Sequence, residues 1–429
     1  MIGITSTKIF STLGSNSSLI PLGIKDVANT AGMTAGSCVT GNSVEGKDRF
    51  MDEFGTQIIW LMGVPVFKKI IDKTVYKAAK FNPDIDVRIL KNKDIFQKAK
   101  EHAAPELQDA FDKVLKHEKT FKGLAVAKFA AATALTLASY SALTIFRHKQ
   151  TEKAIVEEFK KEHAEKIKKA QEQKQESGQK PSFGMNLEPL KQFMFDPVKN
   201  TMIIDGGITT ERLAESRNPQ DFVGYVVKEG GFWASMYFLG PWVQNKIEQN
   251  SAKKNKPIDL DIRILQDEEF QQAIKNKTIE TDLKEFSTNV KDVELYDSLF
   301  DKSDNLVVKM AKKAEIISVL DEKNTIDSTK FIDLDQIRGT KKQIGIKQKI
   351  ENFYKAAHSP ENGDIDKFIS KAINTKRWSI IKNMAASIGA LGLIVPGIIV
   401  AMRYMDKGNK EFQVKKEIHE KLKKEHNLA

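Results

Sequence analysis

The stretch SIIKNMAASIGALGLIVPGIIVAM, residues 379–402, decides the class of this protein. Residues 383–402 carry no charge, and a helix of about 20 apolar residues is long enough to cross the hydrocarbon core of a bilayer. A weaker stretch of the same kind, LAVAKFAAATALTLASYSALTIF, occupies residues 124–146. We therefore predict an integral membrane protein of mainly α-helical fold.

The composition indicates which partners to expect. The chain has 429 residues, a formal net charge of +11 and 29% charged residues. A basic chain can bind nucleic acid or an anionic membrane surface, and the apolar stretches make the membrane the simpler explanation. The lipid bilayer is therefore the expected partner, and no nucleic acid is expected. The single cysteine, Cys38, excludes an intrachain disulfide and a multi-cysteine zinc site.

Two segments of the chain nearly repeat one another. Residues 84–90 read DIDVRIL and residues 259–265 read DLDIRIL, about 175 positions apart, and each is followed by Phe-Gln-x-Ala. Upstream, Pro65 and Pro241 hold corresponding places. This similarity predicts two tandem copies of one unit. The alternation of apolar and polar residues within each segment predicts a short strand-like turn in each copy.

The predicted organisation follows from these landmarks. Each copy is expected to contain a short membrane helix interrupted by proline, the strand-like turn, a long transmembrane helix and a charged stalk helix. The short helix is open to three interpretations: a tilted span, a re-entrant piece or an interfacial helix. The predicted boundaries begin with a polar amino-terminal arm of low order at 1–47. Copy 1 follows at 48–176, with membrane helices at about 54–71 and 123–146, and a linker occupies 177–217. Copy 2 covers 218–429, with membrane helices at about 230–247 and 378–405 and a soluble helical insert at about 278–361.

Residues 1–35 lack the basic start and the unbroken apolar core of a secretory signal, so insertion is expected to rely on the later spans. Two crossings per copy would leave both termini on one side of the membrane, which we expect to be the cytoplasm. The rule that positive charge marks the cytoplasmic side helps little, because lysines and arginines flank both ends of the first long span.

Residues 41–47, GNSVEGK, have the glycine and lysine spacing of a phosphate-binding P-loop. The next position should carry a hydroxyl group for Mg²⁺, but it is Asp48, and no apolar strand precedes the loop. We interpret the segment as a glycine-rich entry to a helix, and no cofactor is predicted.

Four aspartates in the repeated segments have two interpretations. They would surround a hard cation if the copies met face to face, or they would pair with the nearby Arg88 and Arg263 on a partly exposed surface. We favour the ion pairs and predict no metal site. The four residues are Asp84, Asp86, Asp259 and Asp261.

Two pairs of charged residues adjoin the apolar segments. Glu53 and Glu229 would be proton or ion relays if they lay at membrane depth, but their charged neighbours favour a position at the headgroups. Lys128 and Lys382 lie near span ends, where their flexible side chains can reach water, and are interpreted as anchors. Alanines at four-residue spacing between 130 and 142 indicate a face for close helix packing, with the two long spans as expected partners.

No catalytic residue can be assigned, since neither a nucleophile with its base nor a metal-binding histidine spacing is present. The sequence therefore favours a non-enzymatic membrane scaffold or interaction protein, with a protein partner bound through residues 278–361 or the charged stalks. The alternative is a small transporter or channel subunit, because paired proline-interrupted segments in two repeats point to a site at the repeat interface. The oligomeric state stays open.

Overall fold

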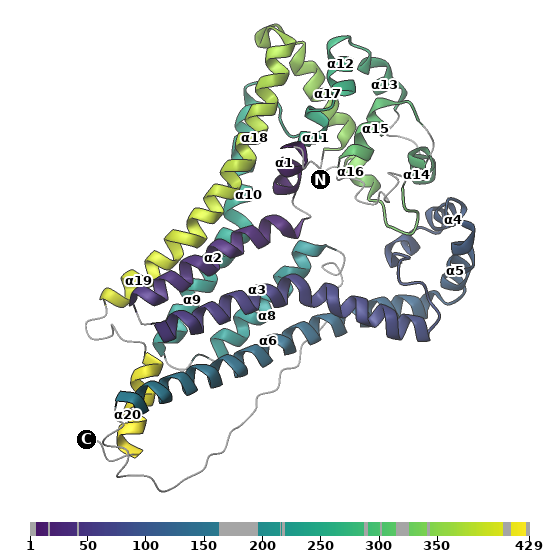
Figure 1. The fold of residues 1–429 in the computed structure, drawn as a ribbon. Helices are drawn as coiled ribbons and strands as arrows, with labels where there is room; N and C mark the ends of the chain where they lie inside the picture. The colour runs from purple at the N-terminus through teal and green to yellow at the C-terminus, as the bar shows by residue number, and fades with distance from the viewer. Residues whose placement is uncertain are drawn as a thin grey trace. The chain divides into compact units, whose positions relative to one another are not determined.

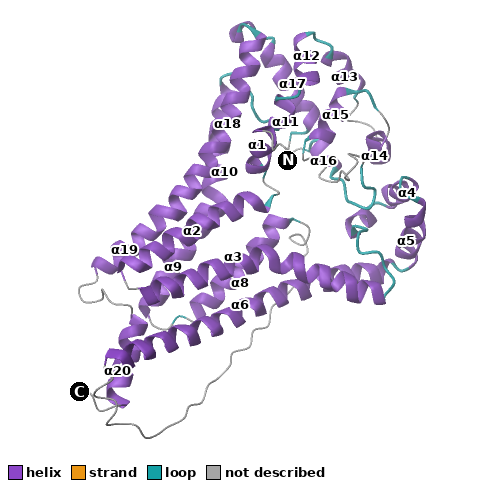
Figure 2. Cartoon of the chain, in the orientation of Figure 1, coloured by secondary structure: helices purple, strands orange, loops and turns teal. Residues whose placement is uncertain are grey.

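The computed structural model describes residues 6–15, 18–40, 43–162, 196–214, 216, 219–286, 291–300, 303–314, 326–340, 344–405 and 413–425. These residues are mainly helical, and no β-strand occurs among them (Figures 1 and 2). The predicted mainly α-helical class is confirmed.

Three helices of the described chain are long and apolar enough to cross a membrane. They span Ser43–Tyr76, Glu118–Glu162 and Ile365–Tyr404, with 34, 45 and 40 residues. They contain the membrane helices predicted at about 54–71 and 123–146, and all but the last residue of the one predicted at about 378–405. The fourth predicted membrane helix, 230–247, is helical but is not one of these three candidates.

The chain forms two compact units, and each is assembled from three separate stretches. The first unit consists of Met1–Asn16, Lys69–Lys128 and Pro241–Met384, and the second of Ser17–Lys68, Phe129–Gly240 and Ala385–Ala429. Each unit therefore combines residues of both predicted copies.

The first unit is a cluster of short helices around an apolar core. Its largest fully buried aromatic side chains include Phe96, Phe111, Tyr296 and Phe353, so residues of the predicted insert share one core with residues from elsewhere in the unit. The helices are α1 (Ser6–Gly14), η1 (Asp72–Tyr76), η2 (Val87–Lys91), α4 (Lys93–Glu101), α5 (Pro105–Lys116), α10 (Gly240–Lys253), α11 (Ile262–Leu265), α12 (Glu268–Lys275), α13 (Ile279–Glu285), α14 (Asp292–Phe300), α15 (Leu306–Lys313), α16 (Leu334–Arg338), α17 (Ile346–Ala357), η6 (Pro360–Asn362) and most of α18 (Ile365–Gly389).

The predicted strand-like turns are wrong. Both repeated segments form a short helix, η2 and α11, because an aspartate caps each one. The side chain of Asp86 accepts a hydrogen bond from the backbone N–H of Arg88 at 2.9 Å, and that of Asp261 accepts one from Arg263 at 2.8 Å. Capping by aspartate starts a helix, and this local signal outweighs the alternating pattern.

The second unit is a bundle of long helices. It contains α2 (Leu19–Thr40), most of α3 (Ser43–Ile71), the larger part of α6 (Glu118–Glu162), α8 (Pro197–Ala214), α9 (Pro219–Trp233), η4 (Ala234–Leu239), η7 (Ala390–Ile394), α19 (Val395–Met405) and α20 (Gln413–Glu425). The charged α20 packs on the end of α6, where Lys415 lies 2.7 Å from Glu158.

Two segments expected to be irregular are helical. The amino-terminal arm forms α1 and α2, and α2 buries Leu22 and Met33 together with several polar side chains. The later part of the predicted linker forms α8. Residues 163–195, which hold the rest of the linker and the end of the first predicted stalk, lie outside the described residues.

The bundle is held by close approaches at glycine, and α3 and α6 lie side by side (Figure 1). Gly63 faces Thr136, and Gly32 of α2 faces Pro396 and the backbone of Gly392. The alanine face predicted for the first long span is wrong, because Ala134, Ala138 and Ala142 are exposed. The buried stripe of α6 is instead Phe129, Thr133, Thr136, Tyr140, Thr144, Arg147 and Thr151.

Replacing Gly32 with alanine should lower the stability of the bundle. A Cβ atom at this position would lie 2.8 Å from Pro396 Cγ and would also meet the backbone of Gly392, so α2 would have to move away. Overpacking of this kind costs about 1–3 kcal/mol, which would be measured as a lower unfolding midpoint of the purified protein in detergent.

The control is Gly230→Ala in α9, because nothing lies within 4 Å of a Cβ atom there. Alanine at an open helical position should stabilise the helix by roughly 0.5–1 kcal/mol. Equal midpoints for the two variants would contradict the close approach at Gly32.

Candidate functional site

The second unit contains a connected cluster of buried ionisable side chains, which we call the charge network. Its members come from α3, α6, α8 and α9, and their side chains are between 1% and 6% exposed. They are Asp48, Asp52, Glu53, Arg147, Arg212, Lys228 and Glu229.

Arg212 of α8 lies at the centre of the network. Its guanidinium donates to Glu229 Oε1 at 2.7 Å and to Asp52 Oδ1 at 3.1 Å. It also donates to the Tyr140 hydroxyl at 2.9 Å and to Thr56 Oγ1 at 3.1 Å. One side chain therefore joins four helices, and the planar guanidinium suits this role because its five N–H groups point in fixed directions.

Lys228 of α9 links the two glutamates that the sequence singled out. Its ammonium lies 2.6 Å from Glu53 Oε1 and 3.2 Å from Glu229 Oε1. Asn29 of α2 donates to Glu53 Oε2 at 3.1 Å, and Thr209 of α8 donates to Glu229 Oε2 at 3.0 Å. Both glutamates are thus surrounded by protein, which differs from the position at the headgroups that their neighbours had indicated.

Arg147 of α6 forms the other end of the network. It lies 3.3 Å from Asp52 Oδ2 and 3.4 Å from Asp48 Oδ2, while Thr151 donates to Asp48 Oδ1 at 2.6 Å. Asp52 therefore lies between two arginines. Buried charges persist only when they are paired in this way, because removing them from water is expensive.

The arrangement follows from the residue pattern of α3. Asp48, Asp52 and Thr56 recur every four residues and lie on one buried face. Its large apolar residues point the other way: Phe50, Phe54, Ile58 and Met62 are 44–57% exposed. A helix with its charges inside and its apolar residues outside suits lipid surroundings better than water.

Sequence reasoning found part of this site. It singled out Glu53 and Glu229, but it missed Arg147, Arg212 and Tyr140. The signal for Asp52 was present, because it lies opposite the exposed aromatic residues of the same helix. Nothing local marks Arg212, which lies more than 150 residues from Asp52 along the chain.

The four aspartates considered for a metal do not form a site. Asp86 pairs with Arg88 at 2.6 Å and Asp261 with Arg263 at 3.0 Å, each within its own segment. In the described residues, no group of three or more histidine, cysteine, aspartate or glutamate side chains could hold a metal ion.

The structure places the glycine-rich segment and the two lysines interpreted as anchors as follows. Residues 41 and 42 lie outside the described residues, and Ser43 begins α3. Glu45, within that segment, lies 2.5 Å from Arg403. Lys128 forms an ion pair with Asp72, whereas Lys382 is exposed.

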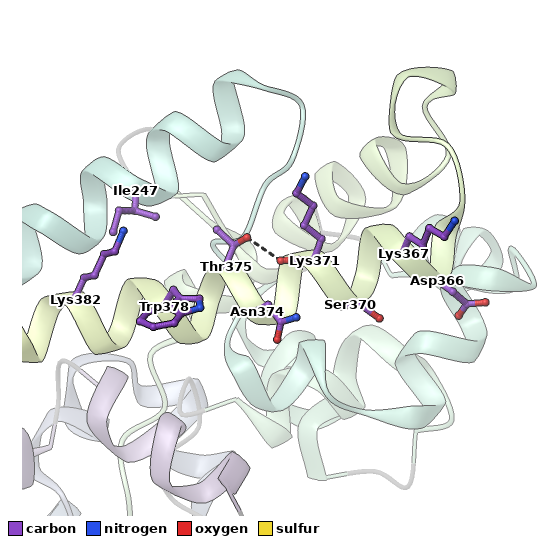
Figure 3. Close-up of a pocket in the computed structure, with 9 residues that line it drawn as sticks. All are labelled: Ile247, Asp366, Lys367, Ser370, Lys371, Asn374, Thr375, Trp378 and Lys382. Atoms are coloured by element: carbon purple, nitrogen blue, oxygen red, sulfur yellow. Dashed lines mark hydrogen bonds between the residues drawn. The ribbon is translucent and has the colours of Figure 1, made fainter.

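A groove of about 820 Å³ runs along α18 in the first unit (Figure 3). Trp378, which is 59% exposed, lies there near Lys382, and Ile247 faces them from α10. The other lining residues are Asp366, Lys367, Ser370, Lys371, Asn374 and Thr375. Tryptophan and lysine near the end of an apolar span are typical of residues at the membrane interface.

A polar contact of the first unit joins α14 to the carboxyl end of α4. His102 Nε2 lies 2.9 Å from Asp297 Oδ1, and Lys98 lies 2.9 Å from Asp297 Oδ2. Burial alone would raise the pKa of Asp297, but the hydrogen bonds from His102 and Lys98 outweigh it and hold that pKa below its usual value. These side chains are about one-third exposed, so the contact is a surface ion pair rather than a reactive site.

Comparisons of the chain with protein-family models, curated proteins and solved structures found no match. The site is therefore interpreted from its own geometry.

Replacing Arg212 with methionine should destabilise the second unit strongly. The change leaves Asp52 and Glu229 buried with less compensating charge, and breaking a buried pair in this way costs about 3–5 kcal/mol. The measurement is the free energy of unfolding in detergent.

The matched control is Arg263→Met, since Arg263 is 28% exposed and, among the described residues, pairs with Asp261. A partly exposed pair is worth less than about 1 kcal/mol. Adding Glu229→Gln to Arg212→Met should recover part of the loss. A loss at Arg212 no larger than at Arg263 would contradict the central role of Arg212.

Proposed function

We propose that this chain is an integral membrane transporter or channel whose working site is the charge network. The observation that carries the proposal is the burial of seven charged side chains inside a bundle whose outer surface is apolar. Ionisable groups at membrane depth are expensive and commonly mark the pathway of an ion or a proton.

We also infer that the chain is built from two copies of one unit. Three resemblances support this duplication. The contact of Asn29 with Glu53 resembles that of Thr209 with Glu229, the capping of η2 resembles that of α11, and α2 and α8 each carry a buried aspartate. In such proteins the binding site lies where the two repeats meet, and the network draws α3 and α6 from the first copy and α8 and α9 from the amino-terminal side of the second.

Irregular turns in the helices agree with this function. The segment η4 is a π-helical turn beside Gly240, and η7 is a second one before Pro396. Turns of this kind inside α-helices often occur at functional sites, because they free backbone carbonyl groups and allow local movement.

The scaffold hypothesis remains the competing proposal. It is favoured by the first unit, whose many short helices form an apolar core of their own and carry charged residues on their surface. In a scaffold the charge network would be a fixed structural element, and the partner would bind the 278–361 segment or the charged helices. The two proposals differ in whether ions move.

If the protein transports, replacing Glu53 and Glu229 together with glutamine should abolish an ion- or pH-dependent flux. The change removes the two carboxylates nearest to Lys228 and keeps the side-chain shape, while Asp52 Oδ2 stays at 3.9 Å from the Lys228 ammonium. The measurement is flux into liposomes that contain the purified protein, under gradients of protons, sodium, potassium or chloride.

The control is the double variant Glu101→Gln and Glu351→Gln, whose glutamates lie in surface ion pairs of the first unit. This variant should transport as the unchanged protein does. Absence of flux with the unchanged protein under every gradient would favour the scaffold.

We further propose four crossings, two in each copy, with both ends on the cytoplasmic side. The segment formed by α9, η4 and α10 would be the fourth crossing, since Phe238 and Trp242 present apolar surface to the outside, each 58% exposed. The protein should stay with membranes after alkaline carbonate extraction. Cys38 is exposed, so a membrane-impermeant thiol reagent should label it only after intact cells are lysed.

A tag at the carboxyl end should behave in the same way as Cys38. Accessibility of the tag and not of Cys38 in intact cells would mean an odd number of crossings between them. That result would agree with crossing by the three candidate spans found among the described residues and would refute the parallel arrangement.

A further inference from the structure

Two buried carboxyl groups of the second unit lie outside the ion pairs of the charge network. Asp26 on α2 is 3% exposed, and Asp205 on α8 is 4% exposed. Asp26 accepts hydrogen bonds from Trp60 Nε1 at 2.8 Å and from Asn29 Nδ2 at 3.3 Å. Asp205 accepts one from the Tyr237 hydroxyl. In the described part of the chain, neither forms an ion pair with a lysine, arginine or histidine, unlike Asp52.

The two sites are built in the same way. Each aspartate lies on the helix that precedes one of the two glutamates, and each receives a hydrogen bond from an aromatic side chain of the following helical segment. Lys25, next to Asp26, turns away and donates to the Met236 carbonyl of η4 at 3.4 Å. The two aspartates are not in sequence register, since Asp26 precedes Glu53 by 27 residues and Asp205 precedes Glu229 by 24, but the same chemistry occurs at both.

The charged surroundings do not neutralise these groups. Asp26 faces Glu53 and Arg212, and Asp205 faces Asp26, Glu229 and Arg212 as well as Tyr237. Arg212 is already held by short contacts to Asp52 and Glu229. The segments η7 and α19, which pack on α2, bring no charge to Asp26, since Arg403 at their far end binds Glu45 and Thr40.

An ionised carboxylate that is buried without a cation is strongly disfavoured, and such a group becomes neutral by taking up a proton. Further polar atoms lie beside Asp26. The Asn29 Oδ1 and Thr30 Oγ1 atoms are buried and have no hydrogen-bond partner in the described structure, and both residues are at most 5% exposed. Buried acceptors without a partner next to a carboxyl group can accept a hydrogen bond from the protonated carboxyl group or from a water molecule that carries the proton.

We propose that Asp26 and Asp205 are the proton-binding groups of this protein, each holding a proton when buried and releasing it when the bundle opens. The proposal rests on the proposed transport function for its purpose, but proton binding itself can be measured without transport. Binding forms the O–H bond of a carboxylic acid, and release returns the proton to water and leaves the carboxylate.

The test is infrared spectroscopy of the purified full-length protein, titrated with pH in a lipid nanodisc with choline as the only added cation. A protonated carboxyl group has its own C=O stretching band. Asp26→Asn and Asp205→Asn should each remove part of the band that titrates, and the double variant should remove most of it. Asp261→Asn, which changes a partly exposed and paired aspartate, should leave the band unchanged.

A second variant keeps the carboxyl group and so does not depend on the tolerance for asparagine. Trp60→Phe removes the indole N–H group, which is the stronger hydrogen-bond donor to Asp26. This donor stabilises the charged form of the Asp26 carboxyl group. The Asp26 part of the band should then titrate at higher pH, by on the order of one unit. No shift in Trp60→Phe, or a band that survives both asparagine changes, would overturn the proposal.

Replacing choline with sodium separates a proton site from a sodium site. Loss of the band at constant pH in sodium would show that sodium displaces the proton, and it would overturn the assignment to protons alone. If the band behaves as proposed but no proton flux occurs in liposomes, the transport function fails and the proton site stands. If proton flux occurs but the titrating band is absent, the transport function stands and the proton site at Asp26 and Asp205 fails.

Discussion

Compensation of buried charge is the constraint on which the second unit depends. Arg212 lies 2.7 Å from Glu229 and 3.1 Å from Asp52, and neither carboxylate is exposed enough to be solvated by water. A charge removed from water must be paired inside the protein. Because the partners come from stretches far apart in the chain, the pairing holds α3, α8 and α9 together. The fold of this unit and its candidate site are therefore the same set of contacts.

The same constraint explains why the helices of this unit are polar inside and apolar outside. Phe50, Phe54 and Ile58 lie on the outer face of α3, while Asp52 and Glu53 lie on the inner face. In water, this arrangement would expose large apolar side chains and bury charges, and both are unfavourable. In a bilayer, the apolar face is solvated by lipid, and the charges are better placed in the interior. The long apolar stretches predict a lipid bilayer, and a bilayer is also the environment in which a charged inner face and an apolar outer face are both favourable.

The sequence predicts the long apolar helices well because length and lack of charge are local properties. Residues 383–402 have no charged side chain to mislead the prediction. The two repeated segments were assigned as strands because their alternation has the period of a strand, whereas the structure starts a helix at Asp86 and at Asp261. The arm at 1–47 was expected to lack order because it is rich in small polar residues. In α2 these small residues allow close packing on η7 and α19. The helix is therefore stabilised by segments more than 350 residues away in the sequence, which no local pattern indicates.

Aspartates of one bundle occupy two contrasting environments. Asp52 lies between Arg147 and Arg212, so its charge is fixed by cations on two sides. Among the described residues, the donors to Asp26 and Asp205 are neutral, namely Trp60 and Asn29 for the first and Tyr237 for the second. A buried carboxyl group without a cation adds no stability to a rigid scaffold, since an apolar residue of similar size would be more stable there. Paired charges hold the helices, and the proposed proton binding gives the two unpaired acids a separate role, which is the division that a coupled transporter would use.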